Sequence, residues 1–144
     1  MSENVTIDFP NGNQYIGEVN NSLPHGKGTL IDPKIGRYDG DFKEGKFDGH
    51  GVLTQNDGIT YTGQFSDGKF EGHGVLVQPE GGRYDGDFRN ARFHGQGMLI
   101  QADGSKFEGV FENGIMNGPG VITLPDNKQI KGRFTDGKFI VDGA

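Results

Sequence analysis

The sequence contains neither cysteine nor tryptophan, and only 31% of its 144 residues are hydrophobic. Without cysteine there can be no disulfide, no thiolate metal ligand and no cysteine nucleophile. The lack of tryptophan disfavours an aromatic cage for choline or carbohydrate. A mean hydropathy of −0.63 would leave a compact globule of this length with too little core. Such a composition instead suits an array of small units that cover one another.

Long apolar runs and clusters of basic residues are also missing. No stretch of 18 apolar residues occurs, and the beginning of the chain, MSENVTIDFPNG, lacks the basic and apolar regions of a secretory leader. The formal net charge is −6, and the 14 basic residues are scattered along the chain. This distribution argues against a nucleic-acid partner and disfavours an anionic membrane lipid. We expect a cytoplasmic protein.

Glycine, by contrast, is abundant, with 27 residues, and it recurs at a period of 23. The stretch RYDGDFKEGKFDGHGVL at 37–53 returns as TYTGQFSDGKFEGHGVL at 60–76 and as RYDGDFRNARFHGQGML at 83–99. Repetition of this kind indicates a repeat array. We expect a single domain, residues 1–144, built from a half repeat at 4–14, five repeats at 15–37, 38–60, 61–83, 84–106 and 107–129, and a partial repeat at 130–144.

Each repeat has the pattern of one β-hairpin. Residues 38–42 alternate apolar and acidic positions, residues 51–55 form a second β-prone run, and an Asn-Asp-Gly turn signal follows. The expected fold is all-β: an elongated, open antiparallel meander of β-hairpins with about twelve short strands. Ile35 does not suit the turn, so we expect that turn to be one residue out of phase. The turn positions at which we expect a positive φ are Gly12, Gly58, Gly81, Gly104 and Asn127.

An open meander leaves two edge strands, which we expect at residues 5–9 and 130–134. Lys131 and Arg133 protect the second edge, whereas the first has only Asp8 as a charge. Pairing of such edges into a homodimer is therefore one interpretation.

No residue pattern indicates a metal site. His50 and His73 each follow an acidic position, but equivalent residues of adjacent hairpins lie two strands, about 9.6 Å, apart, too far for a shared metal ion. We interpret them as solvated loop histidines. The Gly-x-Gly pairs, such as Gly49/Gly51, precede no helix that could bind phosphate, and we interpret them as turn glycines.

The acidic residues do not form an asymmetric site either. They recur at even spacing, which fits a solvated stripe better than a pair of catalytic carboxylates. We therefore expect no enzyme activity, no catalytic residue, no metal and no cofactor. The residues of this stripe are Glu18, Asp39, Asp41, Asp85, Asp87 and Glu108.

The pattern Tyr-x-Gly-x-Phe-x-x-Gly-x-x-x-Gly-x-Gly, seen as YDGDFKEGKFDGHG and YTGQFSDGKFEGHG, closely resembles the MORN repeat (membrane occupation and recognition nexus). The resemblance covers residues 4–143. Phenylalanine replaces the family's usual tryptophan, and Val19 does so in the first repeat; Ser22 and Ala91 depart from the first loop glycine and Val141 from the second. The resemblance implies an open, groove-like β array for protein interaction and scaffolding, with phospholipid binding proposed for some members.

The aromatic columns on one face of this array are the candidate binding site. Their rings can hold the repeats together, and partly exposed rings can also bind an extended peptide or an amphipathic helix. We expect packing to be their main task and the tyrosines to be more reachable than the phenylalanines, because a hydroxyl tolerates water. The predicted protein-binding groove consists of Tyr15, Tyr38, Phe42, Tyr61, Phe65, Tyr84, Phe88, Phe107 and Phe111.

The leading hypothesis is a non-enzymatic scaffold or adaptor that binds a protein or peptide segment in this groove. The alternative is a phosphoinositide-headgroup module, because the last unit is locally basic. Its basic residues are Lys128, Lys131, Arg133 and Lys138.

Overall fold

The computed structural model describes residues 4–143, which form thirteen β-strands and no helix. Residues 1–3 and 144, which the expected domain includes, lie outside the described residues. The strand order in the sheet is the chain order, every pairing is antiparallel, and the sheet is open at β1 and β13. The predicted all-β hairpin meander is confirmed, with one strand more than the twelve expected. The strands are β1 (Asn4–Asp8), β2 (Gln14–Asn20), β3 (Leu23–Asp32), β4 (Gly36–Lys43), β5 (Lys46–Gln55), β6 (Thr60–Ser66), β7 (Lys69–Val77), β8 (Arg83–Arg89), β9 (Arg92–Ile100), β10 (Lys106–Glu112), β11 (Ile115–Thr123), β12 (Gln129–Thr135) and β13 (Lys138–Val141).

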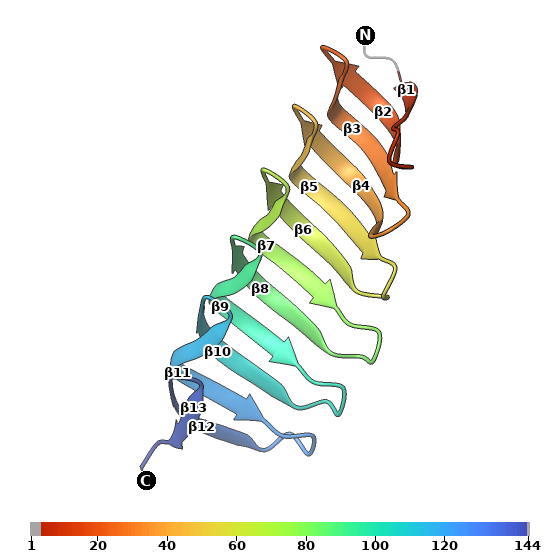
Figure 1. Ribbon diagram of the computed structural model, residues 1–144. Helices are drawn as coiled ribbons and strands as arrows, with labels where there is room; N and C mark the ends of the chain where they lie inside the picture. Colours follow the sequence, from red (N-terminus) through yellow and green to blue (C-terminus); the bar gives the residue numbers. More distant parts are fainter. Residues whose placement is uncertain (1–3, 144) are drawn as a thin grey trace. The chain divides into compact units, whose positions relative to one another are not determined.

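The chain divides into two compact units, and the boundary falls within β7, between Phe70 and Glu71. The first unit contains β1 to β6 and the second contains β8 to β13. Within each unit, hairpin follows hairpin, and each strand lies beside the strand that precedes it in the chain (Figure 1).

Two kinds of turn connect the strands. The turn inside each hairpin uses two successive residues with positive φ, such as Glu44 (50°) and Gly45 (85°), as in the tight turns that match strand twist. At the turns between hairpins the five predicted positions all have positive φ, from 71° to 107°. In the turn at Ile35, the residue with positive φ is Gly36 (144°), one residue later than in the other turns, as predicted. The Ile35 N–H still donates to the Asp32 carbonyl at 3.1 Å.

The Gly-x-Gly pairs lie inside strands, so their interpretation as turn glycines is wrong. In β5 the register against β4 shifts between Gly40 and Phe42, and Gly49 adopts a φ of 100° at this bulge. The second glycine of the pair, Gly51, pairs with Gly40. The second strand of the hairpin therefore begins at Lys46 and not at residue 51.

Three hairpin tips donate a backbone hydrogen bond to the strand before them, from Gly45, Gly68 and Gly114. The Gly45 N–H donates to the Pro24 carbonyl at 2.9 Å, and Gly68 donates to Phe47 at 2.9 Å. Neighbouring tip amides also bond to acidic side chains; the Asn90 N–H donates to Glu71 at 3.0 Å, for example. These tip bonds satisfy amides that a tight turn would otherwise leave to solvent.

The last edge strand differs from the expected one. Residues 130–134 belong to β12, which pairs with β11 on one side and, over residues 132–135, with β13 on the other. The expectation of an edge at 130–134 is wrong, because Asp136 and Gly137 form another tight turn with positive φ and the chain folds back as β13.

Candidate protein-binding surface

Tyr38 shows how one repeat is held together. Its hydroxyl donates to the carbonyl oxygen of Asp41 at 2.7 Å. This bond lays the ring over the paired glycines: a Cβ at Gly51 would lie only 2.5 Å from the ring atoms Cε1 and Cζ of Tyr38. A Cβ at Gly40 would lie 2.8 Å from the hydroxyl. Both glycine columns therefore leave room for the tyrosine, as close approach in a sheet requires.

The same bond recurs along the column. The hydroxyls of Tyr15, Tyr61 and Tyr84 donate to the carbonyls three residues further on, at 2.5, 2.8 and 2.8 Å. Burial, with a smaller contribution from a neighbouring carboxylate, raises the pKa of Tyr15 and Tyr38, and raises that of Tyr84 to about 12. These phenols therefore remain protonated donors at neutral pH.

Three phenylalanines surround a tyrosine in each unit. Tyr38 stacks on Phe47 with ring centroids 3.8 Å apart, and it meets Phe42 and Phe65 edge-on at 5.1 Å. These rings share one side of the sheet, which we call the aromatic face. In the second unit Tyr84 has the same neighbours two periods, or 46 residues, later: Phe93 (stacked, 3.8 Å), Phe88 (5.1 Å) and Phe111 (5.2 Å).

Most residues of the predicted groove belong to the core of this face. The four tyrosines are 0–1% exposed, whereas the phenylalanines at 42, 65, 88 and 111 are 2–4% exposed. Phe107 is half-buried. The expectation that the tyrosines are more reachable than the phenylalanines is wrong, because each hydroxyl donates to a carbonyl of its own strand and the ring lies in the core. Direct contact of these nine residues with a partner stays a prediction.

The more accessible rings are those of Phe47, Phe70 and Phe93, which are half-buried. The sequence analysis missed them, because residues 46–50 and their equivalents were interpreted as loops. A signal was present: each phenylalanine follows a basic residue and stands two positions before a Gly-x-Gly pair, at the period of 23.

Two equivalent pockets open on the aromatic face, one in each unit. The Tyr38 pocket has a volume of about 230 Å³ and is lined by Leu30, Leu53, Phe47 and Ile35, among others. The Tyr84 pocket has a volume of about 270 Å³ and is lined by Leu76, Leu99, Phe93, Gln78 and Gln101, among others. Aromatic and aliphatic side chains line both pockets, and Gln78, Arg83 and Gln101 add polar groups to the Tyr84 pocket. Such a lining can hold an apolar side chain.

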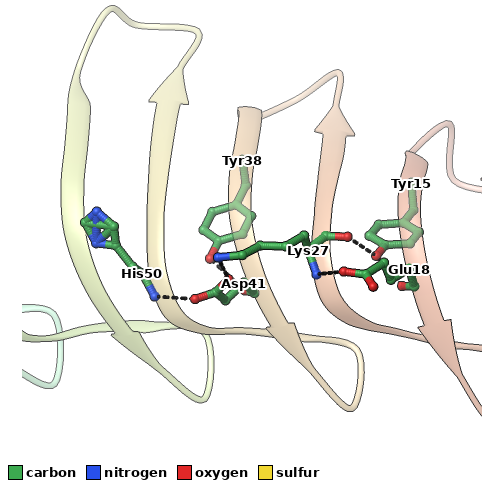
Figure 2. A network of polar contacts seen from close by, with 6 residues as sticks. All are labelled: Tyr15, Glu18, Lys27, Tyr38, Asp41 and His50. Atoms are coloured by element: carbon green, nitrogen blue, oxygen red, sulfur yellow. Dashed lines mark hydrogen bonds and ion pairs between the residues drawn. The ribbon is translucent and has the colours of Figure 1, made fainter. Parts of the chain in front are cut away.

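The opposite face of the sheet is polar, and its acidic residues bond to backbone. Figure 2 shows that Asp41 accepts a hydrogen bond from the His50 N–H (3.0 Å) and contacts Lys27 Nζ. Glu18 accepts from the Lys27 N–H at 2.7 Å. Both amides belong to the bulge that follows the first glycine of a Gly-x-Gly pair, so the acids satisfy donors that the bulge leaves unpaired.

The pKa values of these acids follow from their contacts. Burial acts to raise the pKa of Asp41, but the bonds from Lys27 and from the His50 N–H outweigh it, and the pKa is lowered. The guanidinium of Arg37, 2.9 Å away, lowers the pKa of Asp39. The acidic stripe is thus partly structural and not merely solvated.

His50 and His73 lie in strands β5 and β7, so their placement in loops is wrong. The side chain of His73 is 66% exposed, with Nε2 3.2 Å from Asp85 and Nδ1 3.6 Å from Asp87. In the part of the chain that the structure describes, no group of three or more His, Cys, Asp or Glu residues is placed to hold a metal ion.

The family model of the MORN repeat matches this chain five times, at residues 15–34, 38–60, 61–83, 84–106 and 107–129. The chain belongs to the MORN-repeat family. No curated protein sequence matches it. The first match ends at residue 34, in the turn that carries Ile35 in place of glycine.

MORN repeats are in general modules of interaction. In this chain each MORN match contains one hairpin, and the pockets are formed by successive repeats: Leu30 and Tyr38 of the Tyr38 pocket, for example, belong to different matches. Within residues 4–143 there is no helix that could span a membrane.

Proposed function

We propose that this MORN-repeat protein is a non-enzymatic scaffold that holds a segment of another protein on its aromatic face. The observation that supports the proposal is a small pocket lined by aromatic and aliphatic side chains, which recurs at the same repeat positions in each unit. A pocket of this kind suits an apolar side chain of an extended or helical protein segment.

Exposed apolar residues mark the entrance of the Tyr38 pocket. Ile35 lines this pocket and is 54% exposed, although it stands where four other repeats have glycine. A large apolar side chain left in water at a pocket rim is a feature of interaction surfaces. Ile35 can therefore be substituted to test the pocket without disturbing the buried core.

A phosphoinositide-binding role has less support. The candidate basic residues for this role are those between positions 128 and 138. Among them, Lys128 Nζ lies 3.8 Å from the Asp126 carboxylate. The net charge of −6 also opposes binding to an anionic membrane. We therefore favour the protein ligand.

A matched pair of variants tests the proposal. Ile35→Ser removes the apolar rim of the pocket, and Ile16→Ser makes the same change at a residue that is 41% exposed on the opposite face. Proteins captured from cells by the intact chain would be identified by mass spectrometry, and binding of the captured segment would then be measured by calorimetry. We expect Ile35→Ser to weaken binding about tenfold and Ile16→Ser to leave it unchanged. Loss with Ile16→Ser alone, or binding to phosphoinositide vesicles at physiological salt, would contradict the proposal.

A further inference from the structure

The two pockets of the aromatic face differ in the residues at their rims. The pocket of the first unit is lined by Asp32, whereas the residue 46 positions later, in the pocket of the second unit, is Gln78. The first pocket is also lined by the exposed Ile35, and the equivalent position in the second unit is Gly81. The first pocket therefore has a carboxylate and an additional apolar wall where the equivalent positions of the second unit carry an amide and a glycine.

Asp32 faces the pocket because of its position in β3. It lies two residues after Leu30, on the same face of the strand, and it pairs with Gly36, which has no side chain to cover it. Its carboxylate accepts hydrogen bonds from the Lys34 N–H at 2.9 Å and from Asn13 Nδ2 at 3.4 Å. Since a carboxylate has about four acceptor positions, it can accept further bonds from a ligand.

Asp32 differs from the acids of the opposite face in its ionic contacts. On that face Asp41 contacts Lys27 Nζ, and Asp39 accepts from the guanidinium of Arg37 at 2.9 Å. Within residues 4–143 no ion pair joins Asp32 to a basic side chain. A half-buried carboxylate beside an apolar surface is complementary to a cation, and the net charge of −6 also favours a basic partner.

We propose that the Tyr38 pocket takes a lysine or arginine side chain of the partner segment, an inference that rests on the function proposed above. The methylene stem of such a side chain can lie on Leu30, Leu53 and Ile35, while its charged end stays at the rim beside the Asp32 carboxylate. A purely aliphatic side chain would cover the same wall but would leave the carboxylate half-buried without a cation.

The Tyr84 pocket takes an uncharged apolar side chain. Among the described residues that line it there is no acid, and its polar residues are Gln78, Arg83 and Gln101. The amide of Gln78 lies over Gly82, since a Cβ there would be 3.2 Å from its Oε1 atom. A cation would meet amides and a guanidinium here, so it would gain no ionic partner. The partner segment is therefore basic at the first pocket and neutral at the second.

Two substitutions of nearly unchanged shape alter the charge of the pockets. Asp32→Asn removes the charge from the first pocket and keeps the Oδ1 atom that accepts from the Lys34 N–H, so the turn is retained. Gln78→Glu places a carboxylate at the second pocket. Asp126→Asn is the matched control, because Asp126 accepts the same kind of turn bond, from the Lys128 N–H at 3.0 Å, and lines neither pocket.

The probes are two pentapeptides with blocked ends, in which lysine or norleucine stands between two pairs of alanines. NMR titration of the full chain, with labelled leucine methyl groups, would follow each pocket separately. Leu30 and Leu53 report on the Tyr38 pocket, and Leu76 and Leu99 report on the Tyr84 pocket. The amide spectrum would verify that every variant is folded.

We expect the lysine peptide to bind the Tyr38 pocket more tightly than the norleucine peptide does, and Asp32→Asn to weaken lysine binding about threefold. Gln78→Glu should strengthen lysine binding at the Tyr84 pocket by a similar factor. Asp126→Asn should change neither pocket.

Equal affinity of the two peptides for the Tyr38 pocket, or a preference for lysine that persists in Asp32→Asn, overturns this inference and leaves the proposed function intact. Shifts of the same methyl groups that grow with protein concentration in the absence of peptide also overturn it, since a second copy of the chain would then cover the pocket. No shift with either peptide at millimolar concentration overturns it as well, whereas the capture experiment with Ile35→Ser decides the proposed function separately.

Discussion

The fit between Tyr84 and Gly97 is the contact on which one repeat of the second unit depends, and Gly97→Ala tests it. A Cβ at Gly97 would lie 2.6 Å from Cε1 and Cζ of the Tyr84 ring. The ring cannot easily move away, because it stacks on Phe93 at 3.8 Å and its hydroxyl is bonded to the Asp87 carbonyl at 2.8 Å.

The magnitudes follow from these contacts. Forcing a methyl group into a packed site costs typically 1–3 kcal/mol, and we expect Gly97→Ala to lie at the upper end, about 3 kcal/mol, because the obstacle is a fixed ring. Tyr84→Phe removes only the hydroxyl and should cost about 1 kcal/mol, since the partly buried bond to the Asp87 carbonyl is lost. The double variant should cost less than the sum of the two, because the hydroxyl is the atom of Tyr84 nearest to the new methyl group and Tyr84→Phe removes it together with the bond that holds the ring in place.

Gly82→Ala provides the control. Its Cβ would meet the flexible end of Gln78 at 3.2 Å and the Ile100 carbonyl oxygen at an ordinary contact distance of 3.6 Å, so its cost should stay below about 1 kcal/mol. Urea unfolding followed by circular dichroism would give the free energies, and hydrogen exchange of the β8 and β9 amides would locate the loss in the second unit. Equal costs for Gly97→Ala and Gly82→Ala would refute the argument that the tyrosine ring excludes side chains there.

Three further predictions concern single residues. Ala91→Gly should stabilise the chain by about 0.5–1 kcal/mol in urea unfolding, because Ala91 has a φ of 66° in a turn where other repeats have glycine; a loss of stability would contradict this. Asp41→Asn should lower the free energy of unfolding at neutral pH, and the difference from the unmodified chain should vanish in acid. The pKa of Asp41 is lowered in the folded chain, so the stabilisation by its carboxylate is present above the ordinary pKa of 3.8. It is lost as the pH falls through the pKa of the folded state. A difference that persists at pH 2 would be inconsistent with this. In alkali, Tyr84 should ionise near pH 12 and not near pH 10. Because the pKa of Tyr84 is raised, its contribution to stability is complete below pH 10 and is lost as the pH rises to about 12. Tyrosinate absorbance from Tyr84 at pH 10 in the folded chain would disagree with this.

Much of the fold could be predicted from the sequence, because each local signal recurs at a constant spacing. The alternation in residues 38–42 marks a strand, and glycine at position 58 marks a turn; both are confirmed. The additional strand β13 was missed, although Asp136 and Gly137 match the tight turn of the other hairpins, because only four residues of strand follow.

The binding surface was harder to predict, since exposure depends on contacts between strands. Tyr38 has a polar hydroxyl and was expected to be more reachable than the phenylalanines, yet the bond to the Asp41 carbonyl holds it in the core. Phe47 was overlooked because a glycine with positive φ two residues later resembles a turn. A bulge and a turn use the same glycine chemistry, and only the pairing of the strands distinguishes them.

The bonds between hairpin tips and the strands before them have an evolutionary consequence. The Gly45 amide reaches Pro24 and the Gly68 amide reaches Phe47, each over 21 residues of chain. One inserted or deleted residue between donor and acceptor would break that bond and misplace the tip against its neighbour. The gene can therefore grow or shrink in this region only by duplicating or losing a whole 23-residue hairpin, and small insertions are confined to places that no such bond spans.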